Sequence, residues 1–287
     1  MIYNLDPLKT FCAWADAQPL VRAVILTSTR AVPDAVVDVF SDYDIILALA
    51  DILPFHASRA WLEAFGTVLA LYQDPLMDQN GFQTGGYVVQ FEEGLKIDFT
   101  LWPVKLLDYL AAAPELPDEL DAGYRVLLDK DGITASLKPP SYRAFIPKPP
   151  DEKQYRETIE VFFTEAFYIA KYLRRGDVVA AKYIQDGMQK QEHLIPMLVW
   201  HMEIEHGWKI KPGLYGRRLQ QYLRPDLYTA LESTYTGTSL AEGRLAIERS
   251  NALMLTAGIE VGLALGFQYP EDLHRRAVAY IRKIFDE

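Results

Sequence analysis

Three aspartates stand where they could bind a divalent metal. Asp42 and Asp44 occupy alternate positions at the start of an apolar run, Ile45 to Leu49. Because side chains alternate along a strand, both carboxylates are predicted to project to the same face. Asp98 lies in a second apolar run, Lys96 to Leu101, and becomes a third ligand if the two strands pair. Crowded carboxylates repel unless a cation lies between them, and Mg²⁺ prefers such oxygen ligands. A site of this kind can clamp the oxygens of a phosphoryl transfer.

The Asp-x-Asp pair alone is a weak signal, because two aspartates that open a strand are often solvated turn residues. The order of motifs is more specific. A strand leads into a hydroxyl-rich turn with Arg30, the Asp-x-Asp pair enters the next strand, and Asp98 lies in a later hydrophobic strand. This order resembles that of the polymerase-β-like nucleotidyltransferase superfamily.

Longer stretches carry a closer resemblance. They are Ser41–Ile45, Trp61–Gly66, Phe91–Leu101 and Val126–Asp131 in the first half, and Tyr168–Lys171, Met197–His201 and Ser233–Tyr235 in the second. Together they resemble the aminoglycoside 6-adenylyltransferases that modify streptomycin. The resemblance covers essentially the whole chain and is strongest before residue 132.

The resemblance implies ATP as the donor, with Mg²⁺, and the release of pyrophosphate as AMP is esterified to a hydroxyl of a streptomycin-type acceptor. It implies that Asp42 and Asp44 hold the metal. Asp98 is then either a further metal ligand or the base that takes the hydroxyl proton, and the sequence leaves both roles open. Positioning and charge neutralisation supply most of the catalysis in such a transfer.

The turn before Asp42 is predicted to bind the nucleotide through Ser28, Thr29 and Arg30. The family has Gly-Ser-Arg at these positions. Glycine lets the backbone amides approach a triphosphate, whereas the Cβ of Ser28 disfavours the required backbone angles. Thr29 retains the hydroxyl group of the family's serine, and Arg30 stands where the family has arginine. Weakened ATP binding, another donor nucleotide and a lost activity all remain open.

The second half supplies weaker candidates. The resemblance suggests Lys171 as a nucleotide-binding residue. The alternative is that the aliphatic part of the Lys171 side chain packs on apolar surface and its ammonium lies in water. Acidic residues here can bind the cationic groups of an acceptor through charge-assisted hydrogen bonds, or form only a solvated helix face. These candidates are Asp186, Glu192 and Glu203.

The elements that position these residues form two halves. Strands are predicted at Val21–Leu26 and Ile45–Leu49, a hairpin at Tyr87–Phe91 and Lys96–Leu101, and helices at Asp6–Asp16 and Ser58–Phe65. Beyond a proline-rich segment, helices are predicted at Asp151–Arg174, Val178–Glu205, Arg217–Tyr222, Leu240–Leu265 and Glu271–Phe285. Pro196 is predicted to kink or end the second of these helices. Gly176, Gly207 and Gly266 are predicted to be C-terminal caps.

We therefore predict an α+β fold in two domains. Residues 1–138 form a nucleotidyltransferase domain with a mixed β-sheet and helices packed on one side. Residues 139–150 are a linker, because their five prolines forbid a continuous helix or a central strand. Residues 151–287 form a helical bundle that binds the substrate.

Charge and composition limit the classes of partner. The 287 residues include 29 basic and 39 acidic ones, which gives a formal charge of -10. No cluster of lysine and arginine suits a nucleic-acid backbone, so nucleic acid is disfavoured and a small cationic acceptor is favoured.

The most apolar stretch, Leu253 to Phe267, contains Glu260 and is too short to span a membrane. The single cysteine, Cys12, fits a cytoplasmic protein.

Two classes of function fit these observations. One is an enzyme that transfers AMP from ATP to an aminoglycoside-like cation. The other is a degenerate nucleotidyltransferase-fold protein that acts as a nucleotide-binding or interaction module. The retained aspartates favour the enzyme, because crowded carboxylates without a task cost stability. Ser28 favours the degenerate class.

Overall fold

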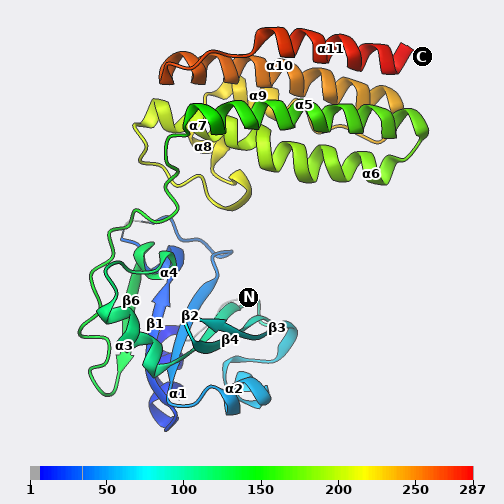
Figure 1. Ribbon diagram of the computed structural model, residues 1–287. Helices are drawn as coiled ribbons and strands as arrows, with labels where there is room; N and C mark the ends of the chain where they lie inside the picture. The colour runs from blue at the N-terminus through cyan, green and yellow to red at the C-terminus, as the bar shows by residue number, and fades with distance from the viewer. Residues whose placement is uncertain (1–6, 34, 287) are drawn as a thin grey trace. The chain divides into compact units, whose positions relative to one another are not determined.

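The computed structural model describes residues 7–33 and 35–286. It divides into two compact units, residues 1–144 and 145–287, and each is described by itself. Among the described residues, all strands lie in the first unit, and the second is helical (Figure 1). The proline-rich segment 139–150 contains neither helix nor strand. The predicted α+β class is confirmed.

The first unit is built on a six-stranded sheet with the order β3-β4-β5-β2-β1-β6. The strands are β1 (Val21–Thr27), β2 (Tyr43–Leu49), β3 (Val68–Gln79), β4 (Phe82–Phe91), β5 (Lys96–Pro103) and β6 (Tyr124–Asp129). The β2–β5 pair is parallel, and the other pairs are antiparallel, so the sheet is mixed as predicted. The predicted β4–β5 hairpin is confirmed, and Gly94 supplies its turn with a φ of 92°.

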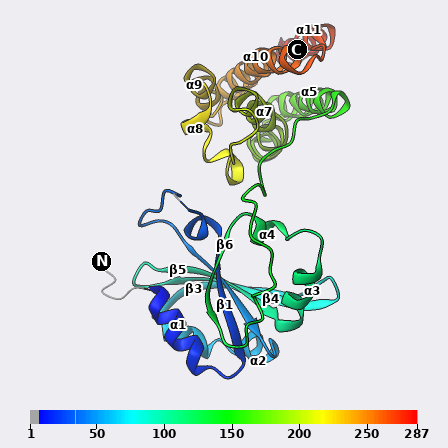
Figure 2. The ribbon, with the colours of Figure 1, turned by 90° about the vertical axis from the view of Figure 1, so that its left-hand side faces the viewer.

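Helices cover both faces of this sheet, whereas we predicted them on one side. They are α1 (Pro7–Ala17), α2 (Leu53–Ala57), α3 (Val104–Ala112) and α4 (Asp118–Asp121), with the 3₁₀ segments η1 (Ser28–Ala31) and η2 (Ala60–Phe65). The cluster that contains Ile45 and Leu47 includes residues of α1, α2 and η2, and the cluster that contains Ile46 and Ala48 includes residues of α3 and α4. Figure 2 shows α1 and α3 on opposite sides. The prediction is wrong because successive residues of β2 are buried, and such a strand needs cover on both faces.

The second unit is a bundle in which α5, α10 and α11 run alongside one another (Figure 1). Its elements are α5 (Glu152–Arg175), α6 (Val178–Lys182), η3 (Tyr183–Leu194), α7 (Ile195–His206), η4 (Leu214–Gly216), α8 (Leu219–Tyr222), α9 (Pro225–Ser233), α10 (Leu240–Leu265) and α11 (Glu271–Asp286). No helix within the described ranges has the length and apolar character needed to cross a membrane.

Side chains and glycines at the helix ends explain where the helices begin and stop. Asp151 accepts a hydrogen bond from the Gln154 amide and caps α5, and a capping box opens α10. The predicted caps Gly176, Gly207 and Gly266 all have left-handed backbone angles. These signals confirm the long helices of the bundle.

The predicted helix over 178–205 is continuous, but its middle is not α-helical. Residues 183–194, which form η3, make a π-helix of 12 residues. Pro196 lies at the first turn of α7, where the missing amide of a proline is tolerated. The predicted boundary at Pro196 is thus the place where the π-helix gives way to an α-helix. Long π-helices are rare, and π-helical turns occur frequently at functional sites.

Candidate active site

Strand pairing brings two of the predicted carboxylates together. In the parallel β2–β5 pair, Asp44 lies opposite Asp98. On the other side of β2, Asp44 lies opposite Thr27, the last residue of β1. Asp42 stands two residues before Asp44, so alternation along an extended chain predicts the same face for both. All three aspartates therefore lie at the N-terminal ends of β2 and β5.

The alternation of β5 fixes which of its side chains face this site. Ile97 and Phe99 are buried in the apolar core, and the Phe99 ring packs at 4.8 Å from the ring of Trp61. These anchors leave Lys96 and Asp98 on the opposite face, where their side chains are about one-third exposed, at 31% and 34%. The site is accessible to solvent, yet its strands are held by the core beneath it.

Lys96 lies between two of the aspartates. Its Nζ is 2.6 Å from Asp42 Oδ2 and 3.1 Å from Asp98 Oδ2. Asp98 Oδ1 is 3.0 Å from the same ammonium but receives no well-directed hydrogen bond from the described residues. Sequence reasoning did not assign Lys96 a role, although its position two residues before Asp98 places both on one face of a strand.

Asp44 is the most perturbed member of the cluster. Burial raises its pKa to about 6, and the negative charges of Asp98 and Asp42 act in the same direction. A hydrogen bond from the Ser28 hydroxyl and the charge of Lys96 oppose this rise. Burial lowers the pKa of Lys96, but its hydrogen bonds with Asp42 and Asp98 outweigh burial and raise it. The electrostatics are those of an anionic site with one internal cation.

The turn after β1 approaches the aspartates. Ser28 has a φ of 60°, the left-handed region that favours glycine, and its hydroxyl bonds to Asp44. Arg30 donates to the backbone oxygens of Asp42 and Ser41, at 3.0 Å from Nε and 2.8 Å from Nη2. Its guanidinium also lies 4.0 Å from the centre of the Tyr43 ring. Arg30 thus fixes the backbone that enters β2, a positioning role that sequence reasoning did not foresee.

The residue types of this cluster fit Mg²⁺, which takes carboxylate oxygens. Three carboxylates share one ammonium, and Asp98 Oδ1 receives no well-directed hydrogen bond from the described residues, so negative charge exceeds its local compensation. In this conformation, no three acidic, histidine or cysteine side chains of the described ranges are already arranged around one metal position. Asp42 and Asp98 are instead paired with Lys96.

Comparison with known proteins decides the family. The streptomycin adenylyltransferase family matches residues 5–284. The chain belongs to this family. It is 27% identical over 263 residues to an aminoglycoside 6-adenylyltransferase of Campylobacter jejuni, covering 90% of this chain and 87% of that protein. It is 26% identical over 271 residues to one of Bacillus subtilis strain 168, covering 93% and 92%.

A crystal structure of an aminoglycoside 6-adenyltransferase from Bacillus subtilis aligns with 99% of this chain and 100% of that one, with a TM-score of 0.49 and 23% identity. The family membership confirms the predicted resemblance and the prediction that this chain is a nucleotidyltransferase.

In this adenylyltransferase-family chain, the candidates of the second unit fall in different environments. The Lys171 ammonium lies 5.8 Å from the centre of the Tyr280 ring on α11. Asp186 on η3 is 2.6 Å from both Lys182 and Lys190, and Lys190 is fully buried. Asp186 therefore already shares its single negative charge between two lysines of the same continuous helix, and none is left for a cationic acceptor.

The other two acidic candidates lie on the same long helix but are not brought together. Glu192 is exposed on η3. Glu203 on α7 is fully buried, which raises its pKa, and it accepts a hydrogen bond from the Ile210 amide at 3.2 Å. Its contacts anchor the loop after α7, so Glu203 has no surface to offer an acceptor. Of the predicted acidic set, Glu192 alone is exposed and forms no ion pair with the other described residues.

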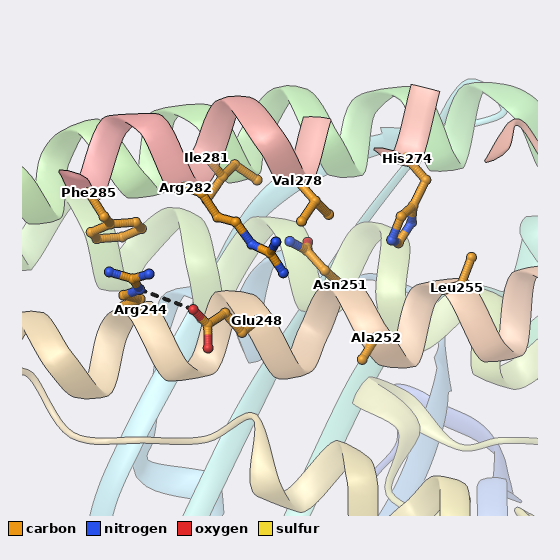
Figure 3. Close-up of a pocket in the computed structure, with 10 residues that line it drawn as sticks. All are labelled: Arg244, Glu248, Asn251, Ala252, Leu255, His274, Val278, Ile281, Arg282 and Phe285. Carbon is orange, nitrogen blue, oxygen red and sulfur yellow. Dashed lines mark hydrogen bonds and ion pairs between the residues drawn. The ribbon is translucent and has the colours of Figure 1, made fainter. Parts of the chain in front are cut away.

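Two pockets lie within the helical unit. One, of about 330 Å³, is lined by residues that include Trp200, Tyr215 and Pro147. The other, of about 200 Å³, lies between α10 and α11, where Arg244 pairs with Glu248 (Figure 3). None of the predicted site residues lines either pocket. The predicted residues that are brought together are those of the sheet unit.

Proposed function

We propose that this protein transfers AMP from ATP to a hydroxyl of a streptomycin-type aminoglycoside, with Mg²⁺. One observation carries the proposal: Asp42, Asp44 and Asp98 meet at the start of the parallel strands, beside the Ser28 turn, in a chain of the streptomycin adenylyltransferase family. The relatives are named aminoglycoside 6-adenylyltransferases, which supports an aminoglycoside acceptor. A cytoplasmic location remains our prediction.

The transfer forms one bond and breaks another. The acceptor oxygen bonds to the α-phosphorus of ATP, the bond from that phosphorus to the bridging oxygen breaks, and pyrophosphate leaves. The hydroxyl proton passes to Asp98 or to solvent. A Mg²⁺ ion held by Asp42 and Asp44, with or without Asp98, would supply charge neutralisation at the phosphates.

The chain's own groups position the donor. The Ser28–Ala31 turn presents backbone amides and the Thr29 hydroxyl, which suit phosphate oxygens. Arg30 holds the backbone of Asp42 in place by hydrogen bonds to its carbonyl oxygen. We propose Lys171 as a further triphosphate contact and Glu192 as a contact for the cationic acceptor, and hold Asp186 and Glu203 to be less suited because of their pairing and burial.

The test is pyrophosphate release by the purified protein with Mg²⁺ and ATP across a panel of aminoglycosides that includes streptomycin. Asp44→Asn is expected to reduce turnover by at least about 100-fold, since it removes a proposed metal ligand. Asp108→Asn makes the same chemical change at an exposed position of α3 and should leave turnover unchanged. Turnover that persists in Asp44→Asn would refute the assignment.

The second candidate function is a nucleotide-binding or interaction module without transferase activity. The observation that favours it is Ser28, whose Cβ stands at a left-handed backbone position where the family has glycine. The same assay separates the two. No pyrophosphate release with any acceptor and nucleotide would reject the transferase. A thermal shift from Mg²⁺-ATP would then support a nucleotide-binding module, and no thermal shift would support an interaction module.

A further inference from the structure

Lys96 contacts two of the three aspartates of the proposed metal site. Its ammonium is 2.6 Å from Asp42 Oδ2 and 3.0 Å and 3.1 Å from the two oxygens of Asp98. Asp42 lies on the loop that leads into β2, and Asp98 lies within β5, so the lysine joins two separate segments. No other lysine or arginine of the described residues forms an ion pair with either aspartate.

The charges of the cluster explain why a lysine is needed there. Asp44 lies opposite Asp98 in the paired strands, and Asp42 precedes Asp44 by two residues, so three negative charges lie close together. Like charges at such distances repel, and a cation between them removes the repulsion. One lysine compensates one charge of three, which leaves the cluster attractive to a divalent cation.

We infer that Lys96 is an internal counter-cation, which holds Asp42 and Asp98 together in the metal-free protein and competes with Mg²⁺ for the same oxygens. The inference rests on the proposed function, because it takes Asp42 as a metal ligand, and it assigns Asp98 the role of a further ligand. It makes Lys96 a positioning residue, which keeps the carboxylates in place between turnovers and sets how readily the metal binds.

Competition has a consequence for nucleotide binding. When Asp42 and Asp98 turn to a metal, the Lys96 ammonium loses its partners, and a polyphosphate offers it new ones. Its side chain is 31% exposed, so it can exchange partners without unfolding β5. Lys96 therefore opposes metal binding when the metal comes alone and favours it when a nucleoside triphosphate comes too.

The test compares Lys96→Met with Lys105→Met, a matched change at an exposed lysine of α3. Calorimetric titration with Mg²⁺ alone measures affinity without any turnover. The Lys96→Met protein is expected to bind Mg²⁺ about three- to tenfold more tightly, because partly exposed ion pairs shift an equilibrium by that order. Its metal-free form should melt at a lower temperature, and Mg²⁺ should raise that temperature by more than in the natural protein.

The same variant is expected to bind ATP with Mg²⁺ more weakly, so the two affinities move in opposite directions. Lys96→Arg keeps the charge and should bind Mg²⁺ as the natural protein does, and circular dichroism checks that each variant is folded. Unchanged or weaker Mg²⁺ binding by folded Lys96→Met overturns the inference. Absence of Mg²⁺ binding by every variant overturns it together with the proposed metal site. Tighter binding without pyrophosphate release from any acceptor supports it and rejects only the transfer reaction.

Discussion

Glu165 provides a stability prediction with a definite sign. It lies on α5, 7% exposed, with Oε2 3.5 Å from Nε2 of His193 on η3 and without a hydrogen bond from the described residues. Burial raises its pKa to about 7, and the charge of Glu192 adds to the rise. The folded protein therefore prefers this carboxyl protonated. Glu165→Gln mimics that neutral form at every pH.

The magnitude follows from the two pKa values. The rise from 4.5 to about 7 corresponds to a cost of about 3 kcal/mol for ionising the folded protein. The unfolded chain releases the proton near its ordinary pKa, so this cost is absent below pH 4.5, grows between pH 4.5 and 7, and is complete above pH 7. Glu165→Gln should therefore gain about 2–3 kcal/mol at pH 8 relative to its effect at pH 5.

Urea unfolding followed by far-ultraviolet circular dichroism measures this difference. The natural protein and the variant are compared at pH 5 and at pH 8, with Glu232→Gln as a matched change at an exposed position of α9. Gln brings its own packing cost at both pH values. The informative quantity is therefore the effect of the substitution on the free energy of unfolding at pH 8 minus its effect at pH 5. An effect of Glu165→Gln that is equal at the two pH values would refute the reasoning.

Two further predictions concern the site. Ser28→Gly relieves a left-handed residue that costs about 1–2 kcal/mol, while glycine loses about 0.5–1 kcal/mol through chain entropy. The free energy of unfolding should therefore rise by no more than about 1.5 kcal/mol. Calorimetry should show tighter binding of ATP with Mg²⁺, and Ser28→Ala, which keeps the Cβ, should not share this gain. Arg30→Met removes the hydrogen bonds to the Asp42 and Ser41 carbonyls, and pyrophosphate release should fall by about 10- to 100-fold. An unchanged rate would show that this clamp does not position Asp42.

Much of the sheet could be predicted because its central strands carry strong local signals. The β-branched run of β1 and the turn at Gly94 are both found where expected. The edge strand β3 was missed because its side chains are mostly partly exposed and Pro75 interrupts it; the ladder is irregular between Asp74 and Met77. Edge strands lack the apolar pattern that burial imposes, so their sequences are less informative.

The candidate site was predictable in its acidic residues but not in its contacts. Alternation along β2 and β5 placed Asp44 and Asp98, and their register came only with the structure. The roles of Arg30 and Lys96 depend on which backbone and side-chain oxygens lie nearby, and a sequence does not specify these. The family's glycine at position 28 did foretell the positive φ that Ser28 adopts. In η3 the widened helical turn has no sequence period that could have revealed it.

The parallel pairing of β2 with β5 also bears on how the protein becomes active as it folds. Asp44 and Asp98 become neighbours only when β5 docks on β2, after the chain has passed through β3 and β4. Such distant pairings close large loops and form slowly compared with helices. A slip of one residue would turn Asp98 away and expose Ile97 and Phe99. Recovery of activity during refolding would therefore follow the completion of the central sheet and lag behind the return of helical signal.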